Sequence, residues 1–370
     1  MRIAFVGGGT AGHFYPLMAV AEQLALDPKR PRLYYIGPTP YDAELLRAHD
    51  IRYVSCPAGK LRRYVSLQNV LDIFRTSAGL FVAIWKLYFI YPDVIFSKGG
   101  YTSVPVLLAA WVLRIPIVIH ESDAVPGRAN TLAKGFARYI AIAHDDAAQY
   151  FPKEKTALVG IPIRRELLTP HPDPFTFLNI PSDRPLIYVT GGSLGAERIN
   201  NLILAALEEL LPHYTIVHQS GVAHHDALTL TAQALITDQE LQQRYYVRGS
   251  LNAITVNALM TAASLIITRA GSTTLFEIAL HGKPAIVIPI PTRVSHDQVQ
   301  NAYSYARTGA ATVMEEANLT EHLLAAEIQT IMNDPERYAA MSNAAKGLAP
   351  KGAADKIAAK LIEIGTAHGS

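Results

Sequence analysis

Glycine, hydroxyl and histidine residues follow a predicted strand at the start of the chain, in a pattern that suits phosphate-ester chemistry. Gly7-Gly8-Gly9-Thr10-Ala11-Gly12-His13 comes directly after the predicted strand Arg2–Val6. Glycines let backbone N–H groups come close to a phosphate, and a neutral imidazole can take a proton near pH 7. His13 is therefore a candidate general base, with a packing histidine at a helix start as the alternative. A tight turn without a ligand is the alternative for the glycines, whereas a dinucleotide fingerprint is disfavoured because Ile36-Gly37-Pro38 stands where its carboxylate belongs.

Further glycine turns follow predicted strands later in the chain. Gly191-Gly192-Ser193-Leu194-Gly195 opens the second half, where Ser193 could donate both its hydroxyl and its N–H to a diphosphate. Lys98-Gly99-Gly100-Tyr101 follows the predicted strand Asp93–Ser97. Arg164 lies between the halves, where a guanidinium could add a charge-assisted contact, with a surface salt bridge as the alternative.

The segment Leu265–Asn301 has the strand, turn, helix and strand order that places ligands at one edge of a parallel sheet. Its first strand ends at Thr268, and Ser272-Thr273-Thr274 leads into a helical pattern. The first N–H groups of a helix have no partner within it, so this helix start is a natural seat for an anion. Glu277 lies within the first two turns, close to a ligand held there. The loop after the second strand carries His296, Asp297 and Gln298. We interpret the segment as the nucleotide-sugar half of a glycosyltransferase site.

Other histidine and carboxylate pairs do not form a metal-binding pattern. His144-Asp145-Asp146 and Ser295-His296-Asp297 lack the i, i+4 histidine pairing and a third ligand nearby. His120-Glu121-Ser122-Asp123 ends another predicted strand, where polar groups converge with the glycine turns. The sequence therefore predicts no metal site and no cofactor.

Strands alternate with helices along the whole chain, which is typical of doubly wound parallel sheets. The pattern breaks at Ile161-Pro162-Ile163 and then restarts. We predict an α/β fold of two Rossmann-like domains that face each other across a cleft, residues 1–162 and 163–349, with a C-terminal helix over residues 353–370 that packs back on the first. The predicted strands are Arg2–Val6, Arg32–Ile36, Asp93–Ser97, Ile115–His120 and Tyr139–Ala143 in the first domain, and Leu186–Thr190, Thr215–His218, Tyr245–Val247, Leu265–Thr268 and Ala285–Ile288 in the second.

The composition excludes several classes of protein. Two domains fit a chain of 370 residues, because single cores rarely grow beyond about 250–300 residues. The chain has 33 lysine and arginine residues and 31 aspartate and glutamate residues. This near balance gives no general excess of positive charge, which argues against nucleic-acid binding. The single cysteine, Cys56, excludes a disulfide framework and fits a reducing cytosol. No signal peptide is expected before Arg2–Val6, and the most apolar segment, Gly79–Tyr91, is shorter than the roughly 20 residues of a spanning helix.

Leu67–Tyr91 is predicted to be a long helix with more large apolar residues than one buried face can hold. Basic residues surround them, including Lys60, Arg62 and Arg63 just before the helix. A basic rim around aromatic residues suits docking on an anionic membrane surface. An ordinary helix with a snorkelling lysine is the alternative. The predicted membrane-facing residues are Phe74, Phe81, Trp85, Arg75 and Lys86.

Taken in order, motifs from both halves resemble the MurG family of bacterial N-acetylglucosaminyltransferases, which convert lipid I to lipid II in peptidoglycan synthesis. They are GGGTAGHFYPLMAVAEQL, KGGYTSVPVLLAAW, GIPIRREL, GGSLGA, TRAGSTTLFEIALHGKPAIVIP and DQVQNA, and together they cover essentially the whole chain. The resemblance implies a GT-B fold, UDP-N-acetylglucosamine as the donor and polyprenyl-diphosphate-linked muramyl-pentapeptide (lipid I) as the acceptor. It also implies inversion at the anomeric carbon, chemistry without a metal, and a peripheral place on the cytoplasmic face of the bacterial inner membrane.

The resemblance also implies roles for single residues. His13 matches the family's loop histidine and is the candidate base for the C4 hydroxyl of the acceptor. Glu277 matches the carboxylate that holds both ribose hydroxyls, and Gln298 matches a contact to the sugar. The residues implied to hold the acceptor are Gly9, Thr10, Ala11, Gly12, Gly99, Gly100 and Tyr101. Those implied to contact the donor are Arg164, Ser193, Ser272, Thr273, Thr274, Glu277 and Gln298, together with Asp123 and with Thr10, Ala11 and Gly12 of the first loop.

Some positions depart from the family's pattern. Ala11 replaces a glycine of GGTGGH, and Leu194 replaces the glutamine of GGSQGA. The family's HEQN reads His120-Glu121-Ser122-Asp123, so a carboxylate stands where an amide is expected to touch the donor sugar. The neighbourhood of Leu251–Ile254 is the best candidate for the contact to uracil. The alternatives that stay open are a UDP-sugar 2-epimerase, a transferase that builds another glycolipid, and a non-catalytic UDP-sugar-binding scaffold.

Overall fold

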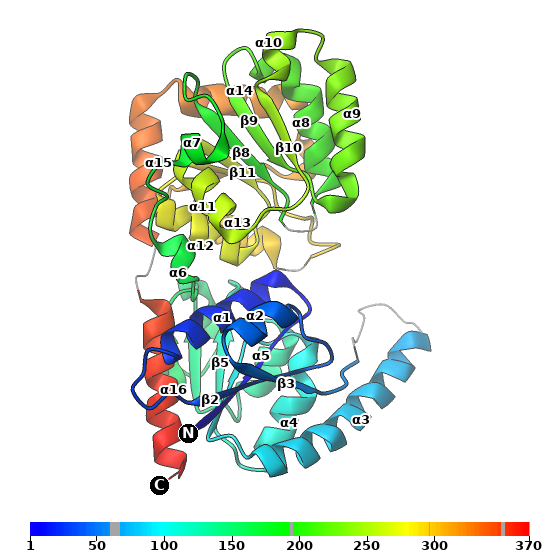
Figure 1. The fold of residues 1–370 in the computed structure, drawn as a ribbon, viewed down its shortest axis with the longest axis vertical. Helices are drawn as coiled ribbons and strands as arrows, with labels where there is room; N and C mark the ends of the chain where they lie inside the picture. The colour runs from blue at the N-terminus through cyan, green and yellow to red at the C-terminus, as the bar shows by residue number, and fades with distance from the viewer. Residues whose placement is uncertain (60–66, 193–194, 296, 349–351, 370) are drawn as a thin grey trace. The chain divides into compact units, whose positions relative to one another are not determined.

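The computed structural model of the protein describes residues 1–59, 67–192, 195–295, 297–348 and 352–369. The chain forms two compact units, residues 1–165 with 350–370 and residues 166–349. Each unit is a parallel sheet covered by helices on both faces, so the predicted α/β fold of two doubly wound domains is confirmed (Figure 1). The predicted donor residue Ser193 lies outside the described residues, as do Leu194, His296, Lys60, Arg62 and Arg63.

The sheet of the first unit has the strand order β3-β2-β1-β4-β5-β6-β7. Its strands are β1 (Arg2–Val6), β2 (Arg32–Gly37), β3 (Ile51–Ser55), β4 (Val94–Ser97), β5 (Ile117–Glu121), β6 (Tyr139–Ile142) and β7 (Thr156–Leu158). The helices are α1 (Ala11–Leu24), α2 (Ala43–Ala48), α3 (Leu67–Ile90), α4 (Val104–Val112), α5 (Arg128–Ala133) and α16 (Ala353–Gly369), with the single turn η1 (Tyr101–Ser103) before α4.

Alternation along β1 decides which helices cover which face of this sheet. Ile3 and Phe5 pack into a core with side chains of α1 and α16, whereas Ala4 and Val6 pack on the other face against α3 and α4. The C-terminal helix α16 lies against α1, β1 and β4 (Figure 1). Two layers of helices therefore hold the central strands from both sides, and only the strand ends stay open to ligands.

The sheet of the second unit has the order β10-β9-β8-β11-β12-β13. Its strands are β8 (Leu186–Thr190), β9 (Thr215–Gln219), β10 (Tyr245–Arg248), β11 (Leu265–Thr268), β12 (Ala285–Val287) and β13 (Ala311–Val313). The longer helices are α8 (Glu197–Leu210), α9 (His225–Leu235), α11 (Ala253–Ala262), α12 (Ser272–His281), α13 (Gln298–Ala306), α14 (Glu321–Met332) and α15 (Pro335–Leu348). The short ones are α6 (Arg165–Leu168), α7 (Pro174–Leu178) and α10 (Gln239–Gln242).

Three strands that the sequence patterns did not predict, β3, β7 and β13, lie at edges of the sheets. An edge strand is covered less than a central one, so it need not form a continuous apolar run. Arg52 interrupts β3, and β7 and β13 have three residues each. The predicted strand Ile115–His120 also shifts to Ile117–Glu121, which brings Glu121 into the sheet.

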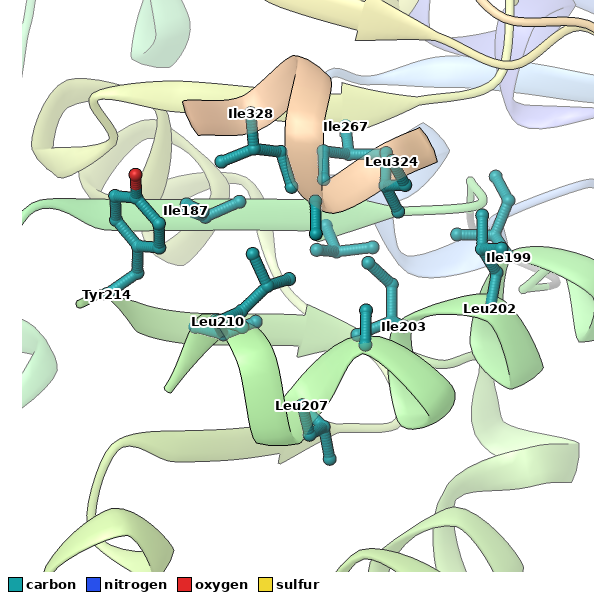
Figure 2. Packing of buried hydrophobic residues seen from close by; sticks show 14 of the residues in the cluster. Ile187, Ile199, Leu202, Ile203, Leu207, Leu210, Tyr214, Ile267, Leu324 and Ile328 are labelled. Atoms are coloured by element: carbon teal, nitrogen blue, oxygen red, sulfur yellow. The ribbon is translucent and has the colours of Figure 1, made fainter. Parts of the chain in front are cut away.

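The core between α8, α14 and the second sheet is formed by aliphatic side chains. Figure 2 shows Ile203 and Leu210 of α8 and Leu324 and Ile328 of α14 gathered about Ile187 of β8. All of these side chains are fully buried, so the helices are fixed by the close packing of side chains of matched volume.

Leu324→Ala should lower the free energy of unfolding by about 2–5 kcal/mol, because it leaves a cavity in this core. Leu323→Ala, at a position 52% exposed on the same helix, is the matched control and should change it by less than about 0.5 kcal/mol. Urea unfolding followed by far-ultraviolet circular dichroism measures both. Equal effects of the two substitutions would contradict the packing described here.

Candidate functional site

The glycine turns of the first unit lie where the strand order reverses. The chain leaves β1 for β2 on one side, and β4 pairs with β1 on the other, so the loops after β1 and β4 diverge at the carboxyl edge. This is the place where open parallel sheets bind ligands. The loop from Gly7 to His13 follows β1, and the loop from Lys98 to Tyr101 follows β4. The structure therefore brings the two predicted acceptor loops together.

Backbone geometry explains why these loops need glycine. Gly9, Gly99 and Gly100 have φ of 92°, 78° and 80°, a conformation that other residues rarely adopt. A Cβ on Gly8 would lie 2.4 Å from the hydroxyl of Tyr35, whose O–H donates to the Gly7 carbonyl at 3.0 Å. The loops are thus held close to neighbouring groups, which leaves little freedom for larger side chains.

His13 is the predicted base, and its imidazole lies between the two loops. Its Nδ1 is 2.7 Å from the Thr10 hydroxyl oxygen. A Cβ added to Gly100 would lie 3.7 Å from its Nε2, so this nitrogen faces the second loop. Burial and, to a lesser extent, the charge of Lys98 lower the pKa of His13 to about 4, against the opposing charge of Asp123. The imidazole is therefore neutral at pH 7, as a proton acceptor must be, but in this state it is a weak base.

A buried polar network lies under the loops at the end of β5. The fully buried ammonium of Lys98 is 2.7 Å from Nδ1 of His120, and Nε2 of His120 is 2.7 Å from the carbonyl of Gly160. Burial holds the pKa of His120 well below its ordinary value, so His120 is neutral. Burial also lowers the pKa of Lys98 to about 8, against the attraction of Glu121 and Asp123.

Glu121 fixes the loop that carries Asp123. Its carboxylate accepts from the backbone N–H of Asp123 at 3.0 Å, from that of Gly127 at 3.0 Å and from the Asn130 amide at 2.9 Å. Burial and the nearby charge of Asp123 raise the pKa of Glu121 to about 7. The sequence analysis assigned no role to Lys98, Glu121 or Asn130. The available signals were the position of Lys98 directly after a buried strand and the polar run from His120 to Asp123 at the end of another.

Arg164 lies in the first unit, close to its boundary with the second. Its guanidinium stacks over the ring of Tyr15 on α1, with Cζ 4.1 Å from the ring centroid. The neighbouring backbone N–H of Arg165 donates to the carboxylate of Glu22 on the same helix. Arg164 is therefore held by a cation–π contact.

The second unit repeats the arrangement, because β8 and β11 are its central pair. In the turn after β8, the backbone N–H of Gly192 donates to the Thr190 hydroxyl at 3.1 Å. A Cβ on Gly195 would lie 1.9 Å from the carbonyl oxygen of Ser220, so this position excludes any side chain. The helix α12 starts directly after the turn that follows β11.

The start of α12 carries the predicted donor residues. The residue before the helix is Gly271, which has no side chain to cap the first N–H groups. Ser272 is buried, and Thr273, Thr274 and Glu277 are partly buried. Gly282 ends the helix with φ of 60°, as its position in the sequence predicts. The structure thus brings these four predicted residues onto the first two turns of one helix.

Gln298 joins two loops at this edge. Its side-chain oxygen accepts from the backbone N–H of Ala270 at 3.2 Å and from that of Ile290 at 3.1 Å. Asn301, one turn along α13, donates to the carbonyl of Ala270 at 3.3 Å. Gln298 therefore holds the loop after β11 against the loop after β12, a role that its spacing in the sequence did not indicate.

The long helix α3 presents a row of aromatic side chains to solvent. Phe74, Phe81 and Trp85 are 68%, 72% and 64% exposed, and Tyr88 and Phe89 continue the row. The opposite face of α3 buries Ala83 and Leu87 in the core beside α4. Arg75 forms an ion pair with Asp72 at 3.2 Å, and the ammonium of Lys86 donates to the carbonyl of Ser55.

Two features are absent from the part of the chain that the structure describes, a metal-binding cluster and a helix that could span a membrane. In residues 1–59, 67–192, 195–295, 297–348 and 352–369, no cluster of three or more His, Cys, Asp or Glu side chains could hold a metal ion. Among the helices over the same residues, none combines the length and the apolar character that a membrane span requires.

Two doubly wound sheets, each with glycine turns where its strand order reverses, define the GT-B class of nucleotide-sugar proteins. The chain matches the model of the glycosyltransferase family 28 N-terminal domain over residues 3–142 and that of the C-terminal domain over residues 186–358. It therefore belongs to glycosyltransferase family 28, and its curated relatives place it in the MurG family.

Those relatives are bacterial enzymes that the chain matches over nearly their whole length. It is 40% identical to the UDP-N-acetylglucosamine--N-acetylmuramyl-(pentapeptide) pyrophosphoryl-undecaprenol N-acetylglucosamine transferase of Shouchella clausii, over 93% of this chain and 95% of the relative. It is 36% identical to the enzyme of the same name from Legionella pneumophila, over 98% and 96%.

Solved structures agree on the fold. The crystal structure of Acinetobacter baumannii MurG has a TM-score of 0.74 at 26% identity, over 98% of this chain and 100% of that one. The UDP-GlcNAc 2-epimerase of Neisseria meningitidis, solved with UDP-GlcNAc bound, has a TM-score of 0.69 at 15% identity, over 98% and 100%. The epimerase shares the fold alone, so the epimerase alternative has less support than the transferase.

Proposed function

We propose that this protein transfers N-acetylglucosamine from UDP-N-acetylglucosamine to the C4 hydroxyl of the muramyl sugar of lipid I, which yields lipid II. The observation that carries the proposal is the 40% identity over 95% of a transferase of that name. The reaction is a displacement at the anomeric carbon. The C4 oxygen forms the new bond, the bond to the diphosphate of UDP breaks, and the configuration at carbon 1 inverts.

On the acceptor side, His13 is proposed to take the proton of the C4 hydroxyl on its Nε2. The Thr10 hydroxyl at Nδ1 orients the ring, and the glycine loops containing Gly9, Gly12, Gly99 and Gly100 would cradle the acceptor's diphosphate with backbone N–H groups. Tyr101 follows the second loop and lies close to Gly9. A positioned base contributes about 10²–10⁴-fold to such a reaction.

On the donor side, α12 is proposed to hold the nucleotide. Its first N–H groups would bind the diphosphate, with Ser272, Thr273 and Thr274 beside them, and Glu277 would accept from both ribose hydroxyls. A helix start stabilises a negative charge by about 0.3–2 kcal/mol. A hydrogen bond from Arg164 would add about 1.5–3 kcal/mol. These contributions grow as the leaving diphosphate gains charge, so they lower the barrier as well as binding the donor.

The rival functions make different products. A 2-epimerase would act on UDP-N-acetylglucosamine alone, whereas the transferase requires the acceptor. A transferase for another glycolipid, which the carboxylate at Asp123 motivates, would prefer a different sugar or lipid in a panel of donors and acceptors. A non-catalytic scaffold would bind UDP and form no lipid II. Incubation of the purified protein with labelled donor, with and without lipid I, separates all of these.

The exposed aromatic row of α3 is proposed to dock the protein on an anionic membrane surface at the cytoplasmic face of the inner membrane. Phe74, Phe81 and Trp85 lie 7 and 4 residues apart and so share one face of the helix. Five exposed aromatic side chains on one helix form an unusual patch for a protein surface. The acceptor has a polyprenyl chain in the bilayer, so docking would bring the glycine loops to its headgroup. Of the two rim cations that the structure describes, Arg75 is exposed, whereas Lys86 donates to a backbone carbonyl.

His13→Ala should lower turnover by at least about 10²-fold while the affinity for UDP stays the same, because the base acts on the acceptor. Steady-state rates with lipid I and labelled donor measure turnover, and calorimetry measures UDP binding. His322→Ala, at an exposed site on α14 of the second unit, is the matched control and should keep full turnover. A His13→Ala protein with normal turnover would remove His13 from the mechanism.

Glu277→Ala should weaken UDP binding by at least about tenfold, because hydrogen bonds to a carboxylate are worth about 1.5–3 kcal/mol. Isothermal titration with UDP measures the change. Glu208→Ala on the exposed face of α8 is the control for loss of one carboxylate and should bind UDP normally. The ribose assignment is wrong if both variants keep the same affinity.

Replacing Phe81 and Trp85 together by serine should lower partition onto vesicles of phosphatidylglycerol by at least about fivefold, because both side chains contribute buried apolar area. Co-sedimentation with the vesicles measures the partition. The control replaces Leu230 and Leu235, which are 68% and 56% exposed on α9, by serine. Equal partition of the two double variants would show that the α3 row does not face the membrane.

A further inference from the structure

A lysine is completely buried beneath the two glycine loops of the first unit. Lys98 follows β4 directly, and its side chain is 2% exposed. Its backbone N–H donates to the carbonyl of Val6 at 2.9 Å, and a Cβ on Gly7 would lie 2.9 Å from the Lys98 Cβ. Lys98 is thus part of the loop after β4, and its Cβ lies directly beneath the loop after β1.

The ammonium of Lys98 is held by one fixed acceptor. The carbonyl of Gly160 can only accept, so Nε2 of His120 bears the proton and Nδ1 has the lone pair that faces Lys98 at 2.7 Å. Burying a cation is costly unless other groups compensate. Glu121 and Asp123 provide compensation through their charges. A neutral side chain of similar length would fill the same space at less cost, which suggests that the charge has a use.

The charge of Lys98 acts on His13. It opposes the protonation of the His13 imidazole, and Asp123 acts in the opposite direction. The titratable groups at this sheet edge, from every element packed there, are His13 of α1, Tyr35 of β2, Lys98 after β4, Tyr101 of η1, His120 and Glu121 of β5, and Asp123. The ammonium of Lys98 lies against the neutral Nδ1 of His120 at 2.7 Å, so its charge can act on a bound anion.

We propose that Lys98 is a positioning residue, whose buried ammonium attracts the acceptor's diphosphate to the two glycine loops and acts through its charge on the His13 imidazole that lies between them. A bound diphosphate offsets the charge of Lys98. His13 then becomes a stronger base at the step in which the C4 hydroxyl must lose its proton. The acceptor thus activates the group that deprotonates it. This inference rests on the proposed function for the identity of the anion, whereas the link between Lys98 and His13 is independent of it.

The link is tested by nuclear magnetic resonance titration of His13 in the whole, ligand-free protein with labelled histidine, assigned by comparison with His13→Gln. Lys98→Met should raise the pKa of His13 by at least about one unit, because the charge of Asp123 is then unopposed. Lys134→Met, which removes another lysine of the same unit, should leave it unchanged. Adding Asp123→Asn to Lys98→Met should lower the pKa again. An unchanged pKa in Lys98→Met overturns the proposal.

A second measurement uses the unaltered protein, so it does not depend on the stability of a variant. Saturating inorganic pyrophosphate should raise the pKa of His13, and the same concentration of sodium chloride should not. A pKa that pyrophosphate does not move overturns the proposal for the anion. Monophosphate at the same concentration should have the smaller effect, because it bears less charge.

Kinetics then separate this inference from the proposed function. Lys98→Met should raise the KM for lipid I by at least about tenfold, leave the KM for the donor unchanged, and move the acidic limb of kcat/KM to higher pH. If Lys98→Met lowers kcat but leaves the pH dependence of kcat/KM unchanged, Lys98 has a structural role only, and the proposal is overturned. Absence of transfer by the unaltered protein would refute the proposed function, while the two titrations would still decide the role of Lys98.

Discussion

The reversal of strand order in each sheet is the constraint on which the rest of the structure depends. A parallel sheet built outward from a central strand in both directions must leave two neighbouring loops that run apart at its carboxyl edge. In the first unit these loops follow β1 and β4, and in the second they follow β8 and β11. Helices cover both faces of each sheet, so this edge is where backbone N–H groups can meet a ligand. Glycine is placed at the positions where a loop turns with positive φ or passes within contact distance of its neighbour, as at Gly100 and Gly195.

The same constraint explains why polar groups are buried at the strand ends. The last residues of β4 and β5 lie deep between the helix layers, yet they support the loops that meet the ligand. His120 is completely buried and is satisfied by one donor and one acceptor, Lys98 and the Gly160 carbonyl. Glu121 accepts from groups on both sides of the following loop and so fixes it to the sheet. In the second unit the hydroxyls of Tyr188 and Thr190 both donate to the Gln219 amide oxygen, and Thr190 accepts from Gly192. The network around Gln219 is built from neutral groups, whereas the one beneath the loops of the first unit includes charges.

Much of this was accessible from sequence because strong local patterns set it. Central strands such as Leu186–Thr190 are continuous apolar runs, and Gly282 ends α12 where the pattern placed it. The edge strands β7 and β13 were not predicted, because three residues are too few to show a recognisable pattern of apolar residues. The side-chain contacts of the site were not predicted for another reason. The stacking of Arg164 on Tyr15, the two backbone contacts of Gln298 and the pairing of Lys98 with His120 join residues distant in sequence, so no local spacing reveals them.

The departure at Asp123 gains a physical explanation from this arrangement. A carboxylate beside loops that are proposed to cradle a diphosphate would repel that ligand, so a chain with Asp123 at this position needs a compensating charge nearby. Lys98 provides it from beneath the loops, where water cannot screen the attraction as it does at the surface. The two charges also act in opposite directions on His13. A change at either position alone would therefore disturb both the ligand and the base, whereas a change at both would largely cancel. Asp123 and Lys98 are best understood as one electrostatic unit, and the carboxylate alone is a poor guide to the identity of the sugar.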